Sequence, residues 1–231
     1  SIFKRKINIP CSLPNEHCVC FGEPGSGKSC FIRSQIRQII LDIWVQSVIL
    51  LEPHGDLSDD IISDILESCE VNGKMDLKAL ARQAEKTIII DPTLNEKYGA
   101  VGFNPIYFIK DQHVYHNTVA EHLIRALKDI WADSWGARME DILRNTSLIL
   151  SELNIPLYFF PDFLTNKVFR NNCLYEVKIN KSAFNFFNEH FNTLKDNDYR
   201  NYIESTRNKF SAFVNNPYIK PIIGQAKSTF N

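Results

Sequence analysis

The residues best suited to chemistry form one uninterrupted run, residues 22–29, in a chain of 231 residues. The run fits the pattern G-x-x-x-x-G-K-[ST], whose glycines let backbone N–H groups curl around a phosphate. In this pattern Lys28 bridges the β- and γ-phosphates, and the Ser29 hydroxyl binds Mg²⁺. The sequence therefore predicts a site for a nucleoside triphosphate and Mg²⁺. Its binding residues are predicted to be Gly22, Glu23, Pro24, Gly25, Ser26, Gly27, Lys28, Ser29 and Cys30.

Such a loop needs a strand before it and a helix after it, because the helix directs its positive amino end at the phosphate. Residues 17–21 form a short apolar run that suits a strand, and residues 31–40 have helical periodicity. Cys30 follows directly after Ser29 and is either a thiol near the phosphates or a small core residue of this helix.

Two later apolar runs, 47–52 and 87–91, also suit buried strands, and helical segments at 57–70 and 77–84 lie between them. Strands that alternate with helices are typical of a parallel sheet covered by helices on both faces. The sequence therefore predicts an α/β fold for the first part of the chain.

From about residue 111 the periodicity is helical, at 113–131, 138–153, 183–194 and 199–214. A Gly- and Pro-containing stretch at 98–105 suits a boundary. We therefore expect two parts: residues 1–110 as the nucleotide-binding part and residues 111–231 as a mainly helical subdomain.

Hydrolysis of a nucleotide needs a carboxylate at the end of a second strand, and Glu52 and Asp91 each end a predicted strand. Either residue could equally be a simple strand terminator. Asp56 and His54 lie in the turn after Glu52. They could reach the γ-phosphate side of a nucleotide, or they could be turn and cap residues of the next helix. The candidate catalytic residues are Lys28, Glu52 and Asp56. No apolar strand ending in Asp-Glu follows residue 91, so we expect nucleotide binding with weak turnover.

Composition narrows the class of protein. The chain is 44% hydrophobic with a net charge of −1 and has no run of eighteen or more apolar residues, so no membrane span or export signal is expected. Six cysteines without a C-x-x-C pair favour reduced thiols and the cytoplasm. Residues 165–231 carry ten Lys and Arg against five Asp and Glu, which suits either a solvated surface or contact with nucleic acid.

Four segments, taken in order, resemble the FtsK/HerA superfamily, and in particular the conjugative coupling ATPases of type IV secretion systems. The segments are the loop at 22–29, Leu-Glu-Pro-His-Gly-Asp-Leu at 51–57, Ile-Asp-Pro at 90–92 with Gly-Phe-Asn-Pro at 102–105, and Ser-Trp-Gly-Ala-Arg-Met-Glu-Asp-Ile-Leu-Arg-Asn at 134–145. Glu52 departs from the family, which usually has Asp there.

The resemblance implies a RecA-like motor that binds ATP and Mg²⁺, assembles as a homo-oligomer, usually a hexamer, and translocates DNA. Components of a secretion system are further implied partners. The chain then corresponds to the amino-terminal part of the motor, without the Asp-Glu pair that orients water. A location at the inner face of the cell membrane would depend on an anchor before Ser1.

Other interpretations stay open. A small GTPase is disfavoured because the guanine-binding Asp is missing from the Asn-Lys-Val-Phe stretch that begins at Asn166. A non-hydrolysing regulatory module or a small-molecule kinase with Arg138 or Arg144 over the phosphates are the alternatives. Trp135 and Arg138 suit DNA or subunit contacts, or else a helical core and an acidic partner. Phe184, Phe186, Phe187 and Phe191 are expected to form a buried helical stripe.

Overall fold

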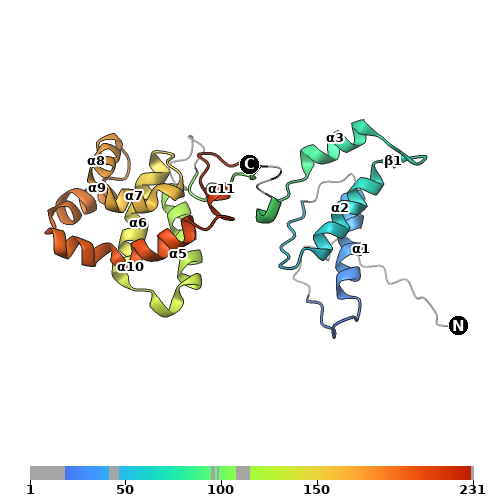
Figure 1. Ribbon diagram of the computed structural model, residues 1–231, viewed down its shortest axis with the longest axis horizontal. Helices are drawn as coiled ribbons and strands as arrows, with labels where there is room; N and C mark the ends of the chain where they lie inside the picture. The colour runs from blue at the N-terminus through green and yellow to red at the C-terminus, as the bar shows by residue number, and fades with distance from the viewer. Residues whose placement is uncertain (1–18, 42–46, 95–96, 98, 108–114, 230–231) are drawn as a thin grey trace. The chain divides into compact units, whose positions relative to one another are not determined.

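The computed structural model describes residues 19–41, 47–94, 97, 99–107 and 115–229 (Figure 1). These residues belong to two compact units, Ser1–Thr87 and Ile88–Asn231, which we call unit 1 and unit 2 and describe separately. Within the described ranges no helix is both long enough and apolar enough to cross a membrane. The domain limits predicted from the sequence, 1–110 and 111–231, stay a prediction.

The predicted α/β fold with a RecA-like parallel sheet is wrong. The structure is 66% helix, and its described residues form ten α-helices and a single sheet, an antiparallel hairpin of two strands. The predicted strands at 47–52 and 87–91 are not strands, and neither are residues 19–21 of the first predicted strand. Residues 17 and 18 lie outside the described part of the chain.

The strands were wrongly predicted because an apolar pattern indicates only a tendency to be buried, whereas a strand is held by hydrogen bonds to a second strand. The side chains of Phe21, Ile49 and Leu51 are 89%, 86% and 89% exposed. An extended run without a neighbouring strand gains neither ladder hydrogen bonds nor buried area. The local pattern could therefore be satisfied without forming a sheet.

Unit 1 is built around two helices. Its described elements are α1 Lys28–Leu41, α2 Asp56–Ser68, β1 Glu70–Val71, β2 Lys74–Met75 and α3 Leu77–Lys86. The helix predicted for residues 57–70 is present as α2, and its Leu57 and Ile61 pack with Ile36 of α1. These three buried residues, with Ile40, Leu50 and Ile65 half-buried against them, form the apolar cluster of unit 1 among the residues described.

The hairpin and α3 follow from local sequence. Asn72 and Gly73 join the two strands with φ angles of 53° and 71°, as a two-residue hairpin turn requires. The Asp76 carboxylate then accepts hydrogen bonds from the N–H groups of Lys78 and Ala79 at 2.9 and 3.3 Å. This cap starts α3, because the first N–H groups of a helix have no acceptor within it.

Unit 2 is a helical assembly, seen on the left of Figure 1. Its described elements are η2 Pro92–Leu94, α5 Tyr115–Ile130, η3 Ala132–Ser134, α6 Ala137–Glu152, η4 Leu157–Phe159, α7 Phe160–Thr165, α8 Lys167–Glu176, α9 Lys181–Asn185, η5 Phe186–His190, η6 Phe191–Thr193, α10 Asp196–Val214 and α11 Lys220–Ile223. The helices predicted at 113–131, 138–153 and 199–214 are present as α5, α6 and α10. Residues 183–194 are also helical, but η5 is a π-helical turn and η6 a 3-10 turn.

The core of unit 2 surrounds α6, which contacts α5, α7, α8, α9 and α10. Ile142, Leu143, Ile149 and Leu150 of α6 are fully buried. The predicted phenylalanine stripe is confirmed as part of this core. Phe187 and Phe191 are fully buried, and Phe184 and Phe186 pack against the cluster as half-buried side chains.

The start of unit 2 is tied to its end by backbone and side-chain hydrogen bonds. Phe103 donates its N–H to the Ile222 carbonyl at 3.0 Å, and the N–H of Thr229 donates to the Gly102 carbonyl at 2.9 Å. The buried Asn104 side chain donates to the Ala226 carbonyl at 3.0 Å. The Gly-Phe-Asn-Pro segment thus has a structural role within unit 2.

Arg170 of α8 is the largest fully buried side chain of the described residues. Its Nη1 donates to the carbonyls of Phe163 and Leu164 and to the Tyr199 hydroxyl, each at 3.0 Å, and its Nε donates to the Asn192 side chain at 3.0 Å. Its guanidinium also lies 5.1 Å from the centre of the Phe191 ring. A buried cation satisfied by carbonyls and hydroxyls in this way fixes the end of α7 against α8 and α10.

We expect Arg170→Ala to lower the free energy of unfolding of unit 2 by about 3 kcal/mol, because it removes the side-chain donor of the buried Phe163 carbonyl and one of the two side-chain donors of the Leu164 carbonyl, and opens a cavity. Urea denaturation followed by tryptophan fluorescence reports on this unit through Trp131 and Trp135. Lys167→Ala, at an exposed position of the same helix, is the control and should change stability by less than about 0.5 kcal/mol. Equal stability of the two variants would show that Arg170 does not hold these elements together.

Candidate functional site

The predicted phosphate-binding residues form a loop that runs directly into α1. Residues 22–27 make the turn, and Lys28, Ser29 and Cys30 are the first residues of the 14-residue helix. Gly25 and Gly27 have φ angles of 80° and 89°, which residues with a Cβ rarely adopt. The two glycines therefore let the backbone reverse directly before the helix.

The amino end of α1 offers donors to an anion. The Phe31 N–H donates to the Gly27 carbonyl at 2.9 Å, which is the first hydrogen bond of the helix. The N–H groups of Lys28, Ser29 and Cys30 precede that bond and have no acceptor within the helix. Together with the partial positive charge of the helix end, they suit a phosphate group.

Lys28 holds the loop and the helix together. Its ammonium group donates to the carbonyls of Gly22 and Glu23 at 2.5 and 2.8 Å. An ammonium group has three donors, so these two bonds leave one for a phosphate oxygen. The lysine thus places a positive charge over the loop while it fixes the loop's first turn.

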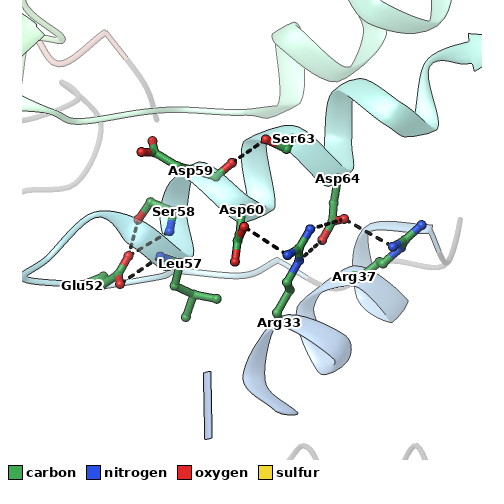
Figure 2. Close-up of polar contacts among 9 residues, drawn as sticks. All are labelled: Arg33, Arg37, Glu52, Leu57, Ser58, Asp59, Asp60, Ser63 and Asp64. Atoms are coloured by element: carbon green, nitrogen blue, oxygen red, sulfur yellow. Dashed lines mark hydrogen bonds and ion pairs between the residues drawn. The ribbon is translucent and has the colours of Figure 1, made fainter. Parts of the chain in front are cut away.

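Glu52, a predicted catalytic residue, caps α2 (Figure 2). Its Oε1 accepts from the Leu57 N–H at 3.0 Å, and its Oε2 accepts from the Ser58 N–H at 2.8 Å and from the Ser58 hydroxyl at 2.9 Å. Desolvation raises the pKa of Glu52, but these hydrogen bonds outweigh it and hold the pKa below its usual value. Both carboxylate oxygens are engaged in the cap, so the structure shows Glu52 as the residue that starts α2.

Asp64 of α2 joins the two helices of unit 1 (Figure 2). Its buried carboxylate accepts from Arg33 Nε at 2.8 Å, from Arg33 Nη2 at 2.9 Å and from Arg37 Nη1 at 3.3 Å. The hydrogen bonds from Arg33 lower the pKa of Asp64, against the effect of desolvation. Arg33 also pairs with Asp60 at 3.0 Å, so one guanidinium of α1 holds two successive turns of α2. We call this group of Arg33, Arg37, Asp60 and Asp64 the clamp.

The remaining predicted residues lie on separate elements. Asp56 is the exposed first residue of α2, in the turn that Glu52 caps. Asp91 belongs to unit 2, where its carboxylate accepts from the Thr93 hydroxyl and N–H at 2.6 and 2.8 Å and starts η2. The Thr93 hydroxyl contributes most to a lowered pKa of Asp91. Asp91 therefore starts η2, and it does not end a strand, because residues 87–91 form none.

The residues of unit 1 fit a magnesium nucleotide by the kind of donor they offer. Mg²⁺ prefers oxygen ligands and retains several waters, and Ser29 supplies a hydroxyl beside the phosphate loop. No group of three or more His, Cys, Asp or Glu in the described residues could hold a metal by itself. A metal here would therefore be bound largely through the nucleotide and water.

The Trp- and Arg-containing motif of unit 2 is satisfied internally. Trp135 Nε1 donates to Glu140 at 2.9 Å, and Arg144 donates to the same Glu140 at 3.1 Å and also pairs with Glu121. Its hydrogen bond from Trp135 is the main cause of the lowered pKa of Glu140. Arg138 lies over the Tyr202 ring, 4.9 Å from its centre, and not beside the acidic partner that one interpretation expected. These partners support a structural role for the motif.

Four cysteines are described, and all are free thiols. Cys69 and Cys173 are buried, and burial raises the pKa of Cys173 to about 11. Cys20 and Cys30 are exposed, so Cys30 does not have the core position that the sequence favoured for it. Cys11 and Cys18 lie outside the described residues.

Arg33 and Asp64 were not predicted as site residues, although the position of Asp64 in the apolar pattern of α2 indicates a buried carboxylate. Asp64 follows Ile61 by three residues and so lies on the apolar face of α2. A carboxylate on a buried face needs a cationic partner, and Arg33 and Arg37 are spaced four residues apart on the preceding helix. The partner could not be identified without knowing that α1 and α2 pack together.

No protein-family model, curated protein or solved structure matches this chain.

We expect Glu52→Ala to make the amides of Leu57 and Ser58 exchange with solvent at least about tenfold faster, because both lose their acceptor. Hydrogen exchange followed by mass spectrometry measures this in the whole chain. Asp59→Ala is the control, since it removes a carboxylate from the same first turn that makes neither bond. Unchanged exchange in Glu52→Ala would refute the cap.

The clamp should depend on pH through Asp64. Because its folded-state pKa lies below the usual value of about 3.9, its stabilising contribution is present above about pH 4 and is lost as the pH falls through the folded-state pKa. The difference in amide protection of α1 and α2 between the native chain and Asp64→Asn should therefore shrink on acidification. A difference that does not change with pH would show that the charge of Asp64 is not what holds the helices.

Proposed function

We propose that this chain binds Mg²⁺·ATP through residues 22–29 and is the nucleotide-binding part of a DNA-translocating ATPase. The observation that carries the proposal is the continuity of the loop with α1, with the Lys28 ammonium held over the loop by two of its carbonyls. This arrangement gathers helix-end amides and a cation at one place, which suits a polyphosphate.

The nucleotide contacts in this proposal are local. They come from the eight consecutive residues 22–29, and the donors among them are set by the turn and by the start of α1. The absence of a parallel sheet from the described residues removes one reason to expect a phosphate site, namely a strand before the loop. It does not change the N–H and ammonium donors of the loop and α1. Adenine as the base, DNA as the polymer, a homo-oligomeric ring and secretion-system partners come from the sequence resemblance alone.

Hydrolysis is the weaker part of the proposal. Glu52 uses both oxygens in the α2 cap, and Asp91 uses its carboxylate to start η2 in unit 2. Asp56 is then the remaining candidate acid of the three. This engagement favours one alternative, a module that binds a nucleotide without hydrolysing it. The kinase alternative loses support because Arg138 and Arg144 have partners within unit 2.

We expect Lys28→Ala to weaken binding of Mg²⁺·ATP by at least about tenfold, because it removes a cation from the phosphate and two hydrogen bonds from the loop. Isothermal titration calorimetry of the whole chain measures the dissociation constant. Lys78→Ala, at an exposed position of α3, is the control and should bind as the native chain does. ATP binding that Lys28→Ala leaves unchanged would refute the nucleotide site.

The motor assignment is tested by turnover. ATP hydrolysis is measured with and without single- and double-stranded DNA, for residues 1–231 and for the product of the complete gene. Stimulation by DNA in the gene product supports the motor. Binding without turnover in both proteins supports the regulatory module and contradicts the motor, and turnover by residues 1–231 with a small-molecule acceptor supports the kinase.

A further inference from the structure

The clamp sets the direction in which α1 and α2 pack. Arg33 of α1 pairs with Asp60 of α2, and Arg37, one turn later in α1, pairs with Asp64, one turn later in α2. Since one step along α1 matches one step along α2, the helices run in the same direction, as Figure 2 shows. Their amino ends therefore lie on the same side of unit 1.

These amino ends carry the predicted chemistry. Two of the three clamp pairs join residues that are 27 positions apart in the chain, and the Arg33–Asp64 pair joins residues 31 apart. Moved back by one helical turn, these offsets set Ser29 of α1 level with the first turn of α2, which begins at Asp56. The residue predicted to face Mg²⁺ and the exposed acid of the capped turn are thus at equivalent levels of two helices held in register.

We propose that Asp64 is a positioning residue of the nucleotide site: its clamp on Arg33 keeps the amino end of α2 beside the phosphate loop, so that the site binds a triphosphate better than a diphosphate. The inference rests on the proposed function. The loop and α1 are one continuous segment and keep the β-phosphate contacts wherever α2 lies. Only groups on the γ-phosphate side depend on the position of α2.

The clamp suits this task because the apolar contact between the two helices is small. In the residues described, the buried cluster consists of Ile36, Leu57 and Ile61, and Ile40, Leu50 and Ile65 pack against it as half-buried side chains. An apolar contact tolerates sliding, whereas a bidentate guanidinium–carboxylate pair has one favourable geometry. Asp64 is almost fully buried, at 3% exposure, whereas the side chain of Asp60 is 53% exposed. The geometric constraint therefore comes mainly from Asp64.

The test compares the affinities for Mg²⁺·ATP and Mg²⁺·ADP, measured by isothermal titration calorimetry on the whole chain. We expect Asp64→Asn to weaken Mg²⁺·ATP about tenfold and Mg²⁺·ADP by less than about twofold. Asp59→Asn makes the same change of charge at an exposed position of α2 outside the clamp, and both affinities should stay within about twofold of the native chain. A general loss of structure would weaken both nucleotides alike.

Each result decides between distinct conclusions. Equal weakening of both nucleotides, or no change in a folded Asp64→Asn chain, would overturn the positioning role while leaving the phosphate site intact. If circular dichroism shows that Asp64→Asn does not fold, Arg33→Lys replaces it, since it keeps one charged donor; it should weaken Mg²⁺·ATP selectively by about threefold, and equal or no weakening overturns the proposal. A native chain that binds neither nucleotide would instead refute the proposed function itself.

Discussion

A carboxylate that is removed from water must be paired, and in unit 1 this requirement determines how the helices are arranged. Asp64 is buried and satisfied by Arg33 and Arg37, whereas the apolar cluster beside it contains three buried residues among those described. Transfer of apolar surface from water has no preferred direction, so such a small cluster cannot select one register of α1 against α2. The ion pair selects the register, and the loop at residues 22–27 and the Glu52 cap each lie at the amino end of one of the two helices.

Unit 2 meets the same requirement with the opposite charge and a different solution. Arg170 is buried among carbonyls, a hydroxyl, an amide and an aromatic ring, without a carboxylate. These neutral partners lie on α7, on η6 and on α10, so Arg170 holds three chain segments together at once. The large core around α6 supplies most of the buried area here, and Arg170 specifies which ends meet.

The sequence predicted those parts of the fold that depend on local periodicity. The long amphipathic segments at 113–131, 138–153 and 199–214 are helices, because their apolar spacing is satisfied by any neighbouring core. The predicted strands are not present among the described residues, because the stability of a strand depends on a partner strand that no local pattern specifies. At the candidate site the loop residues were identifiable from spacing alone. The Glu52 cap and the Asp64 clamp could not be predicted from spacing, since both depend on which segments pack together.

The π-helical turn at Phe186–His190 has a consequence for tracing the ancestry of this chain. A π turn contains one residue more than the α-helical turn it replaces. One extra residue turns all later side chains by about 100° around the helix axis, so it changes which positions after His190 face the core. A homologue with a regular α-helix here would therefore align with a one-residue gap inside an otherwise continuous helix.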